Sequence, residues 1–284
     1  MIKIKWKYYW LIPFQEYWFT NSIEEIDNKA INSKLSNIFI YQSTNSNLFD
    51  FDKELEKTFR KVIFYTWIIE LSKNLEDIFR SFSSTIRNEI NKVRRVIDRE
   101  NDYGYWEMEI ETRYYFSGNS NLEKVFKEFI EFYNNEFAKY KLVPKLTYSI
   151  VKKYVNNLLI AEVKINWQPN LYHVYLIDKV TWIARLEYSV SKINVNKNFK
   201  RLLWWLNSYL HFKDMEYLKN EWFKIYDFGW LYLWESNWYK ELEAQKQITQ
   251  YKMKFHPEVV MQYHYIKESI LYSILKRLYL IVFS

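Results

Sequence analysis

The second half of the chain alternates apolar strands and helices in an order that few folds accommodate. Periodicity of two marks the strands and periodicity of 3.6 marks the helices. The predicted elements are, in chain order, strands at 158–165, 172–178 and 181–190, a basic loop at 191–200, a helix at 202–221, a strand at 223–228, a helix at 238–252 and a strand at 258–266. Strands that alternate with helices in this way predict a mixed α/β fold.

The first half of the chain also contains predicted strands and helices, which are separated by longer polar segments. Predicted strands lie at 2–10, 36–42, 61–70 and 106–112, and predicted helices at 22–33, 72–100 and 120–141. We therefore expect a smaller N-terminal lobe at 1–71 and a larger domain at 72–266. An apolar C-terminal helix is expected at 267–284.

Composition excludes several classes of protein. A chain of 284 residues with 49% hydrophobic and 21% aromatic residues buries a large core and is not disordered. It contains no Cys, which excludes disulfides, thiolate zinc sites and cysteine nucleophiles. The four His show no metal-ligand spacing, so we expect no metal. No apolar run reaches the roughly 18 residues that a membrane-spanning helix needs.

The net charge leaves two interpretations open. A formal charge of +7 and a pI of about 9.1 suit an anionic partner such as nucleic acid, a phosphorylated substrate or an acidic membrane surface. The same balance also arises from a Lys- and Asn-rich composition that an AT-rich genome imposes. The absence of Cys and of a signal peptide favours a cytoplasmic location.

Short motifs add a resemblance to this pattern. They read Ala184-Arg185-Leu186-x-Tyr188-Ser189-x-Ser191, Asn207-x-Tyr209-Leu210-His211-x-Lys213-Asp214, Phe223-Lys224-Ile225-Tyr226-Asp227-Phe228-Gly229 and Ile248-x-x-Tyr251-Lys252-x-x-Phe255. In this order they resemble FemAB-like transferases, a branch of the GNAT-type acyltransferase superfamily. That branch includes enzymes that add amino acids to peptidoglycan precursors. The resemblance spans roughly 66–265 and implies a GNAT-like domain, with the N-terminal lobe interpreted as a degenerate half of the same kind.

The resemblance implies a reaction. An acyl or aminoacyl group passes from acyl-coenzyme A or aminoacyl-tRNA to an amine of a cell-envelope precursor, either a peptidoglycan peptide or an amino sugar. Since the chain has neither Cys nor a Gly-x-Ser-x-Gly motif, direct attack by the acceptor amine fits better than a covalent enzyme intermediate. Peripheral contact with the inner face of the membrane through the last helix is a further expectation. The alternatives are a basic aromatic module that binds single-stranded nucleic acid and a decayed homologue.

The candidate catalytic residues are Asp227, His211 and Asp214. His211 and Asp214 are spaced i, i+3 on one predicted helix face, so their side chains could act together. Asp227 ends a predicted strand, where a carboxylate could accept a proton from an amine. The structural alternatives are a core histidine and an aspartate that binds turn amides.

Candidate binding residues lie in or next to the same motifs. Arg201, Lys200, Trp204 and Asn207 are candidates for donor binding, because a helix N-terminus flanked by cations favours an anionic donor. Arg185, Tyr226 and Lys252 are candidates for substrate binding, the two cations through phosphate or carboxylate contacts. For the charged residues the alternative is a solvated surface.

Glycine is scarce where a compact mixed fold needs it. The chain has 3 Gly and 13 Trp, and average proteins contain about 7% Gly. In proteins of the resembled family Gly commonly stands at the positions of Trp204, Trp222, Trp230 and Trp234, and the resemblance extends this expectation to Trp167 and Trp182. Trp167 also lies at a predicted hairpin tip, where Gly is favoured. One hypothesis is a gene whose UGA codons mean glycine but were translated as tryptophan. The others are a chain adapted to real tryptophans and a decayed homologue.

Overall fold

The computed structural model describes residues 2–8, 12–20, 37–42, 59–100, 104–105, 108–137, 146–148, 152–230 and 242–269. The chain forms two compact units. One joins Met1–Thr66 to Val260–Ser284, and the other is Trp67–Val259. The helix predicted at 22–33 and nearly all of the one predicted at 267–284 lie outside the described residues, and the domain boundaries at 71 and 266 stay predictions.

The first unit contains a group of paired strands. Strand β1 (Ile2–Tyr8) pairs antiparallel with β2 (Ile12–Thr20), which runs parallel to β3 (Asn37–Gln42). Strand β10 (Glu258–Lys267) pairs antiparallel with β3. The sequence predicted one strand at 2–10 and missed β2, which begins beside Pro13. That proline lies within the antiparallel pairing, opposite Lys7, and does not end the strand region.

The second unit is built on a mixed sheet, as the predicted α/β class requires. Its strands lie in the order β9, β8, β7, β6, β5. They are β5 (Ile110–Phe116), β6 (Leu158–Ile165), β7 (Gln168–Asp178), β8 (Ile183–Ser191) and β9 (Ile225–Trp230), and β4 (Arg60–Glu70) leads into them along the chain. Neighbours are antiparallel except β8 and β9, which run parallel. Strands β6 and β7 are buried almost throughout.

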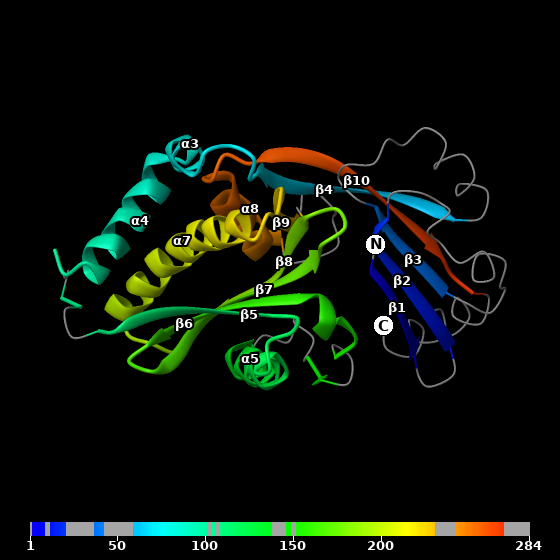
Figure 1. Cartoon of the computed structure of the whole chain (residues 1–284), viewed down its shortest axis with the longest axis horizontal. Coiled ribbons are helices and arrows are strands. Elements are labelled where there is room, and N and C mark those ends of the chain that lie inside the picture. Colours follow the sequence, from blue (N-terminus) through cyan, green and yellow to red (C-terminus); the bar gives the residue numbers. More distant parts are fainter. Residues whose placement is uncertain are drawn as a thin grey trace. The chain divides into compact units, whose positions relative to one another are not determined.

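Helices cover both faces of this sheet. Figure 1 shows α4 (Ser84–Ile97) and α7 (Lys197–Asn220) on one side and α5 (Leu122–Phe137) on the other. The remaining helices are α3 (Leu75–Ser81), α8 (Leu242–Met253) and a short 3-10 helix at Lys152–Asn157. Apolar side chains of α4, α7 and β6, among them Val93, Leu206 and Val163, pack into one buried cluster. This packing fixes the face that α7 presents to the sheet.

Several predicted boundaries were wrong. The single helix predicted at 72–100 breaks at Phe82, and Ser83 caps α4 by accepting the Ile86 N–H at 3.4 Å. The apolar periodicity continues through the break because Phe82 is itself buried, with its ring 5.2 Å from that of Phe255.

The loop predicted at 191–200 also ends early. Asn196 caps α7 by accepting the Phe199 N–H at 2.9 Å, so the helix begins at Lys197. Lys200 and Arg201 consequently stand in the first turns of the helix and not in a loop before it. The residues between the strands predicted at 158–165 and 172–178 do not all form a loop. Only Asn166 and Trp167 make the turn, and β7 already begins at Gln168.

Candidate functional site

The parallel strands β8 and β9 separate near the middle of the second unit. Their pairing runs from Ile183 with Ile225 to Arg185 with Asp227. Beyond that point Gly229 passes so close to β8 that a Cβ on it would lie 2.5 Å from the Leu186 carbonyl oxygen. Strand β8 also carries an irregularity here, because its register against β7 shifts between Leu186 and Tyr188. Such bulges re-aim a strand and its side chains.

A cavity of about 680 Å³ opens where the two strands separate. Its floor includes Leu186 of β8 and Phe228 of β9. Its walls come from α5, α7, α8 and the segment that follows β8. The lining residues are Tyr133, Leu186, Glu187, Tyr188, Ser189, Val190, Ser191, Lys192, Ile193, Lys200, Leu203, Trp204, Asn207, His211, Phe228, Gln247, Ile248, Tyr251 and Lys252.

The structure brings half of the candidate residues to this cavity. Lys200, Trp204, Asn207, His211 and Lys252 line it. The other candidates take different places. Arg201 is exposed on α7, while Arg185, Asp214, Tyr226 and Asp227 are buried and do not line the cavity.

His211 is a buried imidazole at the cavity wall. Its ring lies 5.2 Å from those of Phe228 and Phe255, and its Nδ1 is 2.6 Å from the Tyr226 hydroxyl. Burial lowers the pKa of His211 well below its usual value, and the charges of His173 and Lys252 lower it further. His211 is therefore neutral at pH 7.

A buried polar chain connects His211 to Asp214. The Tyr226 hydroxyl lies 2.9 Å from that of Tyr175, and Tyr175 donates a hydrogen bond to Asp214 Oδ2. His173 Nδ1 lies 2.7 Å from the same oxygen, and the His173 ring is 4.3 Å from the His211 ring. Burial, aided by Asp214, holds the pKa of both tyrosines well above 10, so they remain donors. His211 and Asp214 are thus connected through two tyrosines.

A second branch of this network fixes Asn207. His173 Nε2 lies 2.9 Å from Asn207 Oδ1, and Asn207 Nδ2 donates to the Tyr251 hydroxyl at 2.9 Å. The Tyr251 hydroxyl lies 3.0 Å from Ser208 Oγ, which donates to the carboxylate of Glu89. Every side-chain polar atom of Asn207 is engaged, so its position at the cavity wall is defined.

Glu89 anchors that branch from α4. Its carboxylate accepts the Trp204 indole N–H at 2.9 Å in addition to the Ser208 hydroxyl. Burial raises the pKa of Glu89 above its usual value, while the two hydrogen bonds oppose that shift. Helix α4 therefore supports the cavity wall from behind α7.

Arg185 and Asp227 form a buried ion pair at the point where β8 and β9 separate. Arg185 Nε donates to Asp227 Oδ2 at 2.8 Å, and the Gly229 N–H donates to Asp227 Oδ1 at 2.8 Å. The two side chains are 1% and 0% exposed, so Arg185 is not a surface charge. The contact with Gly229 is the turn-stabilising role considered for Asp227, and its catalytic role stays a prediction.

Lys252 supplies a cation to the cavity. Its Nζ donates to the Phe228 carbonyl oxygen at 2.6 Å. Burial lowers the pKa of Lys252 from 10.5 to about 8, while Asp227 and Glu187 counteract part of that shift. The ammonium group is therefore protonated at neutral pH and loses its proton in mild alkali.

Sequence reasoning missed His173, Tyr175, Tyr251, Ser208 and Glu89. One signal was present for Glu89, a carboxylate on the apolar face that Ile86, Ile90 and Val93 define. His173 and Tyr175 are two residues apart in an apolar strand, hence on one face of it. Which residues this face meets depends on the packing of α7, which the sequence does not display.

Among the residues that the structure describes, no group of three His, Cys, Asp or Glu side chains could hold a metal ion. The polar groups at the cavity contact one another instead. Within the same described ranges, no helix combines the length and the apolar character that crossing a membrane requires.

Comparison with known proteins identifies the fold. Neither a family profile nor a curated protein sequence matches the chain. Among solved structures, FemX is similar over 96% of this chain and 85% of its own, at 13% identity and a TM-score of 0.56. The chain has the FemAB-like fold.

Two further solved structures resemble this chain. A conserved protein from Bacteroides thetaiotaomicron matches over 90% of this chain and 79% of its own, at 11% identity and a TM-score of 0.51. The C-terminal domain of a putative lysylphosphatidylglycerol synthetase from Agrobacterium fabrum matches over 82% and 68%, at 10% identity and a TM-score of 0.50. These likenesses confirm the predicted mixed α/β, GNAT-like fold class. In this FemAB-like fold the cavity lies at the connection from β8 to α7, the segment for which the sequence predicted donor binding.

Proposed function

We propose that the chain is an acyltransferase that moves an acyl or aminoacyl group to an amine of a cell-envelope precursor, either a peptidoglycan peptide or an amino sugar. The donor is acyl-coenzyme A or aminoacyl-tRNA. One observation carries the proposal: a neutral His211 and the cation of Lys252 line one cavity at the separation of β8 and β9. The FemAB-like fold and the four motifs support the reaction class.

The proposed reaction needs no covalent enzyme intermediate. The amine nitrogen of the acceptor attacks the carbonyl carbon of the donor, and a new C–N bond forms. The C–S bond of a thioester, or the C–O bond of an ester, breaks with its electron pair on the leaving atom. The proton lost by the amine passes to His211 and then to the leaving thiolate or alkoxide, which balances the step.

The buried polar chain behind His211 suits this role. Tyr226 engages Nδ1, which leaves Nε2 as the ring nitrogen for proton transfer. The negative charge of Asp214 reaches the ring through Tyr175 and Tyr226, so it favours the imidazolium that forms during transfer. In the proposal Asp214 therefore acts through the tyrosines and does not touch the substrate.

The donor is proposed to enter along the first turns of α7. Lys200, Trp204 and Asn207 line the cavity there, and Arg201 stands exposed beside them. The first turn of α7 carries no acidic residue. A helix N-terminus with flanking cations attracts the phosphates of either donor. Both donors are cytosolic molecules, which places the proposed reaction in the cytoplasm or at the inner face of the membrane.

The acceptor is proposed to meet Lys252. Its ammonium group suits a carboxylate or phosphate of the precursor. Asp227 lies close enough to stabilise this cation, and Arg185 in turn holds Asp227. Tyr226 contributes through His211 and not by direct contact with the acceptor.

A transfer assay tests the proposal. Labelled acyl-coenzyme A and labelled aminoacyl-tRNA are each offered with a muramyl pentapeptide precursor and with glucosamine, and the labelled amide is measured. We expect transfer from one donor, and its loss in His211→Gln but not in His256→Asn, which changes an exposed histidine. An absence of transfer from both donors, with tight binding of single-stranded nucleic acid, would instead favour the binding module.

Binding distinguishes the donors. An acyl-coenzyme A enzyme binds coenzyme A saturably and with modest dependence on salt. An aminoacyl-tRNA enzyme binds tRNA with an affinity that falls steeply as salt rises, because counterions are released. Lys200→Ala is expected to weaken donor binding more than Arg201→Ala, because Lys200 lines the cavity and Arg201 does not.

A further inference from the structure

Three tryptophans occupy backbone conformations that favour glycine. Among the described residues, six residues other than glycine have positive φ, and Trp167, Trp182 and Trp222 are three of them, at +67°, +58° and +66°. A bulky side chain is rarely found in this region, because its Cβ crowds the backbone. The three glycines that the chain contains also have positive φ.

Trp167 lies in a turn whose chemistry is well defined. Ile165 of β6 pairs with Gln168 of β7, so the hairpin loop consists of Asn166 and Trp167 alone. Their φ values are +49° and +67°. A two-residue loop with positive φ at both positions is a type I′ turn, for which Asn-Gly is the preferred pair. The asparagine is present, and tryptophan stands at the glycine position.

Trp222 lies in a second motif of this kind. At the end of α7 the Phe223 N–H donates to the Leu218 carbonyl at 2.9 Å, and the Trp222 N–H to the Lys219 carbonyl at 3.1 Å. These two hydrogen bonds define a Schellman motif, in which the residue at the position of Trp222 is left-handed and usually glycine.

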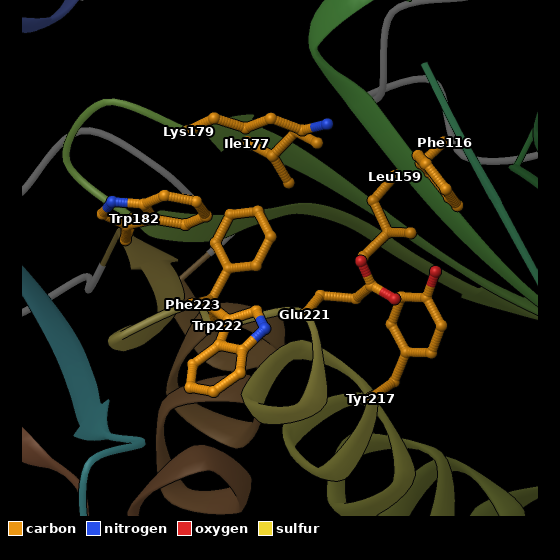
Figure 2. Close-up of a pocket in the computed structure, with 9 residues that line it drawn as sticks. All are labelled: Phe116, Leu159, Ile177, Lys179, Trp182, Tyr217, Glu221, Trp222 and Phe223. Atoms are coloured by element: carbon orange, nitrogen blue, oxygen red, sulfur yellow. The ribbon is translucent and has the colours of Figure 1, made fainter. Parts of the chain in front are cut away.

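Trp182 ends the four-residue loop between β7 and β8. Asp178 pairs with Ile183 across this loop, and the Trp182 carbonyl accepts the Lys224 N–H at 2.9 Å. Its backbone is therefore held in place by β9 on one side and by the hairpin on the other. Figure 2 shows the Trp182 and Trp222 rings on either side of Phe223, at a pocket of about 220 Å³.

Packing does not account for two of these side chains, while the third, Trp182, is half-buried with its ring 5.9 Å from that of Phe223. Trp167 is 66% exposed and Trp222 is 79% exposed, so neither indole adds much to a core. By contrast, Trp67 and Trp205 are buried and stand in regular strand and helix. The conflict between residue and backbone is thus confined to turns.

We infer that Trp167, Trp182 and Trp222 are glycines in the protein that the source cell makes, because that cell reads UGA as glycine. Turn geometry carries this inference independently of the proposed function. It does not extend to Arg99, Asn166 and His256, the other described residues besides glycine with positive φ, which no tryptophan codon explains.

If UGA is read as glycine, the identity of residue 204 in the candidate donor site also depends on its codon. This residue is helical, so its backbone does not decide its identity, but its indole lines the cavity and donates to Glu89. A UGA codon here means that the natural cavity extends past position 204 toward Glu89 and Ser208. A UGG codon leaves the cavity as described.

The test is to identify the residues in the natural protein. Peptides that contain positions 167, 182 and 222 are sequenced by mass spectrometry from the source cells, and the codons are read from the gene. We expect glycine and UGA at all three positions. Tryptophan at any of the three, or a UGG codon there, overturns the inference.

A stability measurement on purified protein provides a second test. The triple variant Trp167→Gly, Trp182→Gly, Trp222→Gly is expected to melt higher than the parent, by roughly 2–4 °C per site. Trp67→Gly is the matched control and is expected to melt lower, because Trp67 is 2% exposed. A triple variant that melts no higher than the parent contradicts the inference.

Discussion

Gly229 and Trp222 adopt similar left-handed backbones at two places in the second unit, with opposite consequences. Gly229 has φ of +79°, and a Cβ on it would meet the Leu186 carbonyl oxygen. Residue and backbone agree there, and the close approach places β9 beside β8 where the cavity begins. Trp222 has φ of +66° and an exposed indole that the turn does not need. The preference for glycine at positive φ is satisfied at Gly229, beside the cavity, and violated at Trp222, away from it. Such a violation without a functional reason calls into question whether residue 222 is tryptophan in the natural protein.

The two regions also treat charge differently. Behind the residues that line the cavity, Arg185, Asp227 and Asp214 are fully buried and each is held by a partner. Around the pocket of Figure 2, Lys179 and Glu221 are exposed. Burying ionisable groups costs stability, and proteins concentrate that cost at functional sites. The comparison therefore supports the proposal that the chemistry takes place at the cavity and not at the pocket of Figure 2.

The largest expected effect is the loss of the proposed base, His211. His211→Gln is expected to lower kcat about 100- to 10,000-fold, because Gln cannot accept the proton of the amine. The parent should keep its activity well below pH 6.5, since the pKa of His211 is lowered and the ring stays neutral there. Initial rates across pH measure both effects. A variant with parental kcat would show that His211 is only a core residue.

Breaking the buried ion pair is the next largest effect. Asp227→Asn is expected to lower the free energy of unfolding by about 3–5 kcal/mol, because it leaves Arg185 buried without its counter-charge. Urea unfolding measures this loss. Arg185→Met serves as the control, because it also breaks the pair. If Asp227 has the catalytic role predicted for it, Asp227→Asn loses more activity than Arg185→Met at a temperature where both are folded. Equal losses would make Asp227 structural.

Gly229→Ala tests the close approach of the strands directly. We expect a loss of stability on the order of 3 kcal/mol, from the left-handed backbone together with the contact to the Leu186 carbonyl. Gly118→Ala is a matched control, since φ there is +98° but no atom lies within 4 Å of the added Cβ. A loss at Gly229 no larger than at Gly118 would show that this contact does not limit how closely β9 approaches β8.

Lys252→Met is expected to lower activity while it raises stability. We expect kcat/KM to fall about 10- to 100-fold, the range for one charge-assisted contact. In the parent, kcat/KM should decline as pH rises through about 8, since Lys252 then loses its proton.

The stability of the same variant should change in the opposite direction. The pKa of Lys252 is lowered from 10.5 to about 8 in the folded chain, so the unfolded chain binds more protons between these values. The burial cost is therefore fully present below pH 8 and is relieved as pH rises toward 10.5. Lys252→Met is expected to melt higher than the parent at pH 7, and a lower melting temperature would contradict the assignment.

Much of the second unit could be predicted from sequence, and the reason is periodicity. The three antiparallel strands β6, β7 and β8 and the helix α7 followed from apolar spacing alone. The break at Phe82 could not be predicted, because apolar spacing continues through it. Asn196 as the cap of α7 was overlooked because the polar residues around it were interpreted as a loop.

The candidate site was predictable only in part. Residues that one helix carries, such as Asn207 and His211, could be grouped by their spacing. His173 and Tyr175 reach Asp214 over a separation of about 40 residues, and only strand register and helix packing bring them together. The spacing of His211 and Asp214 predicted that their side chains could act together, and in the structure two tyrosines connect them.

The most direct test of the account is single-turnover transfer from labelled aminoacyl-tRNA or acyl-coenzyme A to a peptidoglycan or amino-sugar amine, with the parent and His211→Gln compared side by side. The account predicts a labelled amide from the parent with one donor, formed at least about 100-fold more slowly by His211→Gln. Equal rates for the two proteins, or saturable donor binding with no amide formed by either, would contradict the assignment of acyl transfer to this cavity.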